Sequence, residues 1–369
     1  MQLLVVVLLI VSLYYFFVAN TRYKLPDYFC GLNVLLGLLT VYGCCLMIEY
    51  NPAEYAIPVN SFNYLKRILI SIVPIYPFYV FTKEGLIDEK KIQTLFFILL
   101  VVTIANYYGK QSRMLYAAML MGSSREEFTS NVGYEFLALI PFCVFFRKKP
   151  LVQYIALGVC IIFLLMAMKR GAILIGAICL FWFLWKNVNN VSIKQKVSLL
   201  VLAFLLSFIS FLFVKKQMED SWYFQKRIED TLEGKTSNRD VLYSRFSYYF
   251  LNETTPLQFI FGSGANATLK VYNNYAHNDW LEIAVNQGLL GIFVYLFYWI
   301  IFFMSARSKK IDQSKRLAMQ LILISTFLQT LFSMSYGSWG YITMLVLAFC
   351  LTRENNHVQI GNSSESDKK

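Results

Sequence analysis

The residues best suited to chemistry lie in one polar stretch that begins Ala276-His277-Asn278. Asp279 and Glu282 follow with the spacing of a capping box, so we expect a helix to begin at Trp280. The free N–H groups and the positive dipole end of a helix start favour anions and disfavour imidazolium. His277 would therefore be neutral and able to accept a proton. A lone histidine is equally at home in a structural role, so both interpretations stand at this point.

Arginine is the second residue type that could serve a reaction. Ser237 or Asn238 can cap a helix that passes through Leu242 and Phe246, and Arg239 then lies in its first turn. A cation there opposes the helix dipole, so helix stability does not explain it. A solvated arginine is the plain alternative to a functional one.

A further pair of cations, Lys169 and Arg170, separates two apolar runs with almost no loop around it. The pair is either a snorkelling hairpin turn or a cationic rim that faces the interior of the protein. Phe261-Gly262-Ser263-Gly264 predicts a tight turn nearer the histidine. We expect no metal site, because the polar stretch offers one histidine and no cysteine.

The elements that position these residues are apolar. The chain is 57% hydrophobic and only 15% charged, whereas soluble domains carry about 25% charged residues. Long uncharged runs without polar alternation predict an all-α polytopic membrane protein and argue against a soluble enzyme and a β-barrel. Eleven spans are expected, at 2–19, 27–48, 66–82, 92–108, 131–146, 151–168, 171–186, 197–214, 288–306, 317–334 and 337–352.

The distribution of lysine and arginine predicts the orientation. With the N-terminus outside, the inner segments hold more than twice as many of these residues as the short outer ones. We expect eight spans in 1–214, a partly helical external loop in 215–287, three spans in 288–352, and a disordered inner tail in 353–369. The net charge of +12 then reflects topology, and no nucleic-acid partner is expected.

The order Asn238-Arg239-Asp240, the glycine turn at 261–264, Ala276-His277-Asn278 and Gly288-Leu289-Leu290-Gly291 resembles the core of the O-antigen ligase and polymerase superfamily (Wzy/WaaL type). Met168-Lys169-Arg170-Gly171-Ala172 is similar to the family's Ser-Arg-Gly element, with lysine in place of serine. The motif region covers about a sixth of the chain, and it does not separate polymerase from ligase.

This resemblance implies a membrane glycosyltransferase with a GT-C-like, all-helical architecture, inverting, without cofactor or metal. The donor would be an oligosaccharide on a polyprenyl (undecaprenyl) diphosphate, and the acceptor a sugar hydroxyl in surface polysaccharide synthesis. His277 would be the base, and Arg170 and Arg239 would bind the diphosphate. Helpers at lower rank are Arg113, Arg125, Arg245, Lys169 and Asn278.

The resemblance also implies a location in the bacterial inner membrane, with the site facing the periplasm. A flippase and a chain-length regulator are the protein partners to expect. Polymerase is favoured over a ligase that acts on lipid A–core. The more distant alternatives are a transporter of lipid-linked sugars and an O-acyltransferase. A transporter would need polar residues at the centres of several spans, and an O-acyltransferase would need its histidine within an apolar run.

Overall fold

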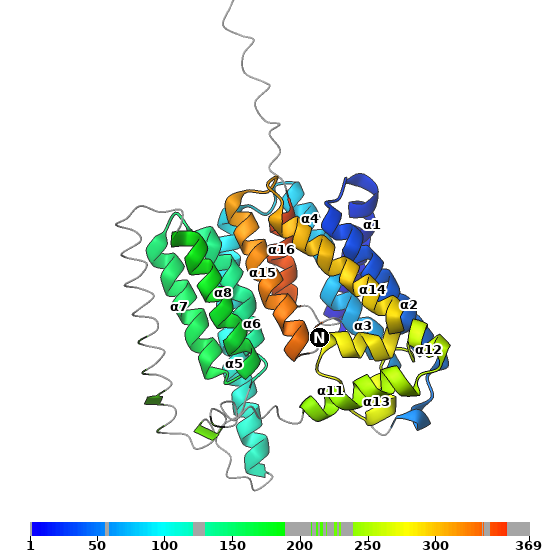
Figure 1. Cartoon of the computed structure of the whole chain (residues 1–369). Helices are drawn as coiled ribbons and strands as arrows, with labels where there is room; N and C mark the ends of the chain where they lie inside the picture. The colour runs from blue at the N-terminus through cyan, green and yellow to red at the C-terminus, as the bar shows by residue number, and fades with distance from the viewer. Residues whose placement is uncertain are drawn as a thin grey trace, which may run out of the picture.

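A computed structural model describes residues 2–55, 59–120, 130–188, 239–333, 335 and 340–352, with single positions between 208 and 229. These residues form a bundle of helices, and no strand occurs among them (Figure 1). The chain is therefore all-helical over its described part, as its composition predicts.

The helices agree in place with the expected spans. They are α1 (Gln2–Arg22), α2 (Asp27–Glu49), α3 (Ser61–Ile72), α4 (Ile75–Lys83), α5 (Glu89–Leu120), α6 (Gly133–Leu139), α7 (Pro150–Met166), α8 (Arg170–Val188), α14 (Asp279–Arg307), α15 (Gln313–Phe332) and α16 (Tyr341–Leu351). Short 3-10 helices η1 (Pro52–Glu54) and η2 (Ile140–Phe146) join them, and α3 breaks from α4 next to Pro74.

Six segments of the described chain are long and apolar enough to cross a membrane. They are Val5–Arg22, Asp27–Glu49, Ser61–Lys83, Glu89–Ala117, Arg170–Asn187 and Asp279–Arg307. Three shorter apolar helices accompany them, at Gly133–Phe146, Pro150–Met166 and Tyr341–Leu351. The expected span at 197–214 and the expected inner tail fall almost wholly outside the described residues.

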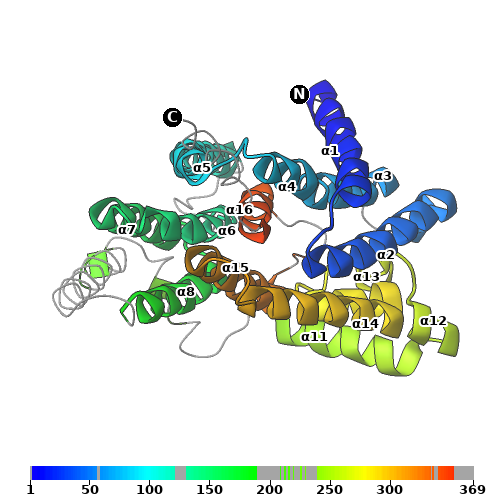
Figure 2. The same cartoon turned by 90° about the horizontal axis from the view of Figure 1, so that it is seen from above.

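Helix α14 is the element that joins the bundle to the polar segment. It packs against α2, where a Cβ on Gly31 would lie 3.3 Å from the Cα of Tyr298, so the two backbones approach closely. The hydroxyls of Tyr28 and Tyr298 are 3.0 Å apart in the same contact. On its other side α14 contacts α15, which in turn lies beside α8 (Figure 2).

The polar segment folds into short helices below the bundle in Figure 1. These are α11 (Arg239–Tyr248), the π-helical turn η3 (Tyr249–Glu253), α12 (Pro256–Phe261) and α13 (Ala267–Tyr272). The predicted helix through Leu242 and Phe246 is confirmed as α11, while its expected caps lie outside the described residues. Phe246 is fully buried against the neighbouring short helices.

Two glycines fix how this segment meets α14. Gly288 interrupts α14 with φ 67° and ψ −159°, and Gly262 has φ 78° in the predicted tight turn. A Cβ on Gly288 would overlap the backbone of Gly262 and Ile260, and a Cβ on Gly262 would overlap that of Asn286 and Gln287. The turn also donates from Ser263 N to Val285 O at 2.9 Å and from Gly264 N to Asn286 O at 3.0 Å. Backbone carbonyls next to the break in α14 are thereby hydrogen-bonded.

Gly288→Ala is expected to lower the free energy of unfolding by about 2–5 kcal/mol. Two costs add: alanine disfavours this backbone conformation, and its Cβ would overlap the 261–264 turn. Gly85→Ala is the matched control, since Gly85 also has positive φ (78°) but nothing lies within 4 Å of its Cβ position. That variant should lose only about 1–2 kcal/mol. Thermal unfolding of the purified proteins in detergent measures both. Equal losses would show that the overlap is unimportant.

Candidate active site

His277 lies in the loop between α13 and α14, at a backbone φ of 54°. Helix α14 begins at Asp279 and its cap is Asn278, whose Oδ1 accepts from Trp280 N at 2.9 Å and from Leu281 N at 3.2 Å. The histidine thus immediately precedes a capped helix start, as predicted. The capping residue itself is one position earlier than expected.

The predicted capping box of Asp279 and Glu282 is wrong, because both carboxylates are fully buried. Asp279 accepts from Ser335 N at 2.7 Å, from Ser335 Oγ at 2.5 Å and from the Tyr295 hydroxyl at 2.9 Å. Buried carboxylates need such partners, because burial removes them from bulk water.

Glu282 supports the histidine loop from the other side. It accepts from Thr268 Oγ1 at 2.5 Å and from Ala276 N at 2.8 Å. The residue before His277 is therefore held by the first turn of α14, and Asp279 connects the same turn to the segment that follows α15. The two acids fix the backbone around His277.

The C-terminal end of α15 joins Arg239 to the histidine. Arg239 donates from Nη1 to Phe332 O at 2.8 Å, and Asn278 donates from Nδ2 to Leu331 O at 3.4 Å. The Tyr243 hydroxyl lies 3.2 Å from Leu331 O and 3.3 Å from His277 O. The last carbonyls of a helix lack partners within it, and a cation is favourable there. Arg239 opposes the dipole of its own helix and complements that of α15.

The electrostatic surroundings of His277 are cationic. Burial of the half-exposed ring lowers the pKa of His277, and the positive charges of Arg239 and Lys169 lower it further. The expectation of a neutral imidazole agrees with this direction. Burial and the two cations are causes that the sequence analysis did not predict.

Lys169 is brought to the histidine by a tight turn after α7. Met168 has φ 50°, and Ser130 N donates to Ala167 O at 2.9 Å, which ties the turn to the segment before α6. Gly133 packs against the same turn, since its Cβ position is 3.4 Å from Lys169 Cβ. The charge of Lys169 acts on His277, which for this residue favours the inward rim over a snorkelling hairpin.

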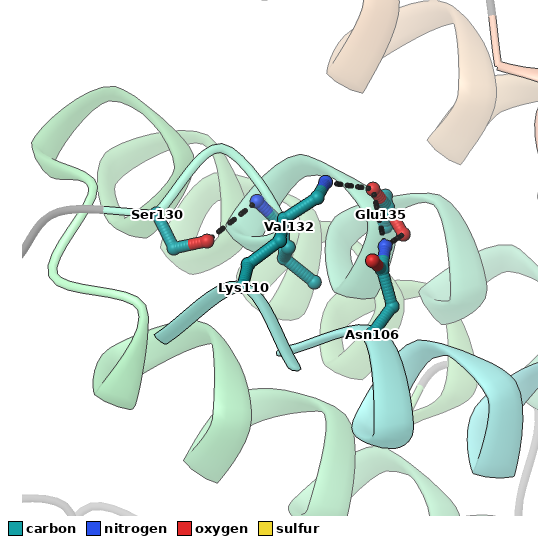
Figure 3. Close-up of polar contacts among 5 residues, drawn as sticks. All are labelled: Asn106, Lys110, Ser130, Val132 and Glu135. Atoms are coloured by element: carbon teal, nitrogen blue, oxygen red, sulfur yellow. Dashed lines mark hydrogen bonds and ion pairs between the residues drawn. The ribbon is translucent and has the colours of Figure 1, made fainter. Parts of the chain in front are cut away.

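A polar cluster supports the segment before α6 (Figure 3). Glu135 accepts from Asn106 at 2.9 Å and forms an ion pair with Lys110 at 3.2 Å, and Ser130 Oγ accepts from Val132 N at 3.3 Å. Lys110 and Asn106 come from α5, so this cluster connects α5 to the turn that holds Lys169. Its role in the site is positional.

The remaining candidate arginines are placed differently. Arg170 is half-buried as the first residue of α8, beside Lys169. Arg113 is exposed on α5 and donates to Gly109 O of its own helix at 3.0 Å. Arg245 is exposed on α11, with its guanidinium carbon 6.0 Å from the centroid of the Tyr272 ring. Arg125 lies outside the described residues. The structure thus brings Arg239, Lys169, Asn278 and His277 together.

Tyr243 is the site residue that sequence reasoning missed. It lies four residues after Arg239, on the same face of α11, and it contacts both His277 and α15. Burial raises the pKa of its hydroxyl, while the nearby Arg239 opposes that shift. The i, i+4 spacing was the available signal.

Residues 155–296 match the family model described as O-Antigen ligase. The match contains Lys169, Arg170, Arg239 and His277. No curated protein matches the chain.

Proposed function

We propose that this member of the O-antigen ligase and polymerase superfamily transfers a glycan from a polyprenyl-diphosphate donor to a sugar hydroxyl. The observation that carries the proposal is the position of His277, whose ring shares its surroundings with Arg239 and Lys169 and has a lowered pKa. A base next to anion-binding groups is the combination that this reaction requires.

The reaction divides the work between these groups. The acceptor oxygen attacks the anomeric carbon while the bond from that carbon to the diphosphate oxygen breaks, so a single displacement inverts the configuration. His277 takes the hydroxyl proton. Arg239, Lys169 and Arg170 stabilise the negative charge that develops on the departing diphosphate, a task for which arginine's planar fork is suited. The chain's own cations perform this step, and the proposal assigns no metal.

The acceptor distinguishes a polymerase from a ligase. Purified protein in lipid vesicles, supplied with a polyprenyl-diphosphate oligosaccharide alone, should produce a ladder of longer lipid-linked glycans if it is a polymerase, the activity we favour. Product formed only after lipid A–core is added would identify a ligase. Movement of the donor across the vesicle membrane without any new glycosidic bond would contradict the proposal and identify a transporter.

The proposed topology has eleven spans across an inner membrane. Helix α11 and His277 face the periplasm, and the C-terminal end of α14 faces the cytoplasm. Ser244→Cys on α11 and Lys310→Cys after α14 are both at exposed positions. In a chain whose seven native cysteines are replaced, an impermeant maleimide should label only Ser244→Cys in intact cells. Labelling of only Lys310→Cys would show that the orientation is the opposite of the one proposed.

The pH dependence follows from the lowered pKa of His277. The base must be neutral, so kcat/KM should stay level near pH 7 and fall only as pH drops through a pKa below the ordinary 6.5. Lys169→Met removes one of the two cations and should move this acid limb to higher pH.

Lys66→Met is the control for that measurement, because Lys66 lies on α3 and is not among the charges that act on His277. It should leave the acid limb in place. An acid limb at or above pH 6.5 in the unmodified protein would contradict the assignment of a cationic environment to the base.

A further inference from the structure

The end of the bundle opposite His277 contains a pocket between α8, α14, α15 and the 3-10 helix η2. Helix α14 begins beside the histidine and ends at Arg307, so the pocket lies one helix length from the site (Figure 1). Its volume is about 360 Å³. Five cationic side chains line it, namely Arg147, Lys186, Arg307, Lys309 and Arg316.

No carboxylate lines this pocket, although acids are present nearby. Asp88, Glu89 and Asp312 line a neighbouring hollow of about 810 Å³, which shares Arg147 with the pocket. Within the described part of the chain, Arg147, Arg307, Lys309 and Arg316 form no ion pair. A preference for positive loops places cations on one side of a membrane, but it does not require four helical elements to direct them into one acid-free pocket. Such a convergence of like charges is stabilised by a bound anion.

An apolar groove lies along the contact between α14 and α15, next to the pocket. Its volume is about 490 Å³, and it is lined by Trp299, Ile300, Phe303, Leu323, Ile324, Phe327 and Leu328. The guanidinium carbon of Arg307 lies 5.0 Å from the centroid of the Phe303 ring, so one residue pair connects the two hollows. Gln320 of the pocket precedes Leu323 and Ile324 by three and four positions, which places them on one face of α15.

We propose that the pocket and the groove together bind one anionic phospholipid of the surrounding membrane. The phosphate would lie among the five cations at the end of the bundle, and an acyl chain would occupy the groove beside Phe303. Basic pockets between membrane helices bind anionic head groups, and the groove adds the apolar partner that a soluble anion would not use. Figure 2 shows α8, α15 and α14 side by side at this end of the molecule.

The test uses the full-length protein in detergent micelles, with bound lipids counted by native mass spectrometry. Dioleoylphosphatidylglycerol should bind well below the concentration at which dioleoylphosphatidylcholine binds. Arg307→Gln combined with Arg316→Gln should weaken that binding about 25-fold, at about fivefold for each cation. Lys310→Gln is the matched control, because Lys310 is exposed in the loop between α14 and α15 but does not line the pocket. It should leave the affinity within about twofold.

A second variant separates a lipid from a free anion. Ile300→Trp fills the groove without changing any charge, so it should weaken phosphatidylglycerol binding while inorganic phosphate competes as before. Thermal unfolding in lipid-free detergent shows that each variant is folded. Equal affinity for the two lipids would overturn the proposal. So would unchanged phosphatidylglycerol binding in folded Ile300→Trp, which would identify a site for soluble anions.

Discussion

His277→Ala is expected to lower the rate of glycan transfer by about 10²–10⁴-fold, because the acceptor loses its base. Binding of the lipid-linked donor should persist, since Arg239 and Lys169 remain. The fold should also persist, because the loop is held to the described helices through the carbonyl of His277 and the N–H of Ala276. Transfer rate and donor affinity of the purified variant measure the two effects separately.

Two further substitutions sharpen this experiment. His277→Asn suits a left-handed backbone better than alanine does, so it separates loss of the imidazole from backbone strain at φ 54°. His277→Gln can hydrogen-bond a hydroxyl but cannot accept its proton at neutral pH. Substantial transfer by His277→Gln would mean that the residue positions the acceptor. Full transfer by His277→Ala would remove His277 from the site.

Arg239→Ala is the second change with a large expected effect, a loss of about 10²–10³-fold in transfer rate. Arg239→Lys should retain part of the activity, because it keeps the charge. A lysine lacks the planar fork that lets one side chain donate to Phe332 O and to a diphosphate at once. Donor affinity and single-turnover rate should both fall in the alanine variant.

A structural role of Arg239 at the end of α15 predicts a different result. If Arg239 only stabilised that helix end, Arg239→Ala would lower the unfolding temperature and leave the activity of the folded protein near normal. Arg245→Ala is the control on the same helix, since Arg245 is exposed near Tyr272. An equal loss in Arg245→Ala would show that both arginines act on the donor.

Local signals predicted much of the fold. Apolar runs located the long helices, and the glycines at 262 and 264 marked the tight turn. Helix α11 followed from its apolar spacing. Each of these features depends on residues close together in the sequence, where period and backbone preference act directly.

Contacts between distant segments could not be predicted in this way. Asp279 and Glu282 have the spacing of a capping box, but that spacing cannot reveal that Ser335 and Thr268 are their partners. The anchoring of Arg239 and Tyr243 to the end of α15 joins residues about ninety positions apart. Burial, Arg239 and Lys169 together lower the pKa of His277, and Lys169 comes from a separate turn. Tertiary packing decides these features, and a single sequence does not encode them in any local pattern.

The break at Gly288 also sets the height of the chemistry above the membrane. Beyond it, residues 289–307 extend for about 28 Å, close to the ~30 Å hydrocarbon thickness of a bilayer. The buried polar residues of α14, Asp279, Glu282, Asn286 and Gln287, all lie before the break, where protein surrounds them. A thicker or thinner bilayer changes the tilt of such a helix and not its length. Tilt would move His277 relative to Lys169, so under the proposed function we expect the rate of glycan transfer to vary with the acyl-chain length of the host membrane.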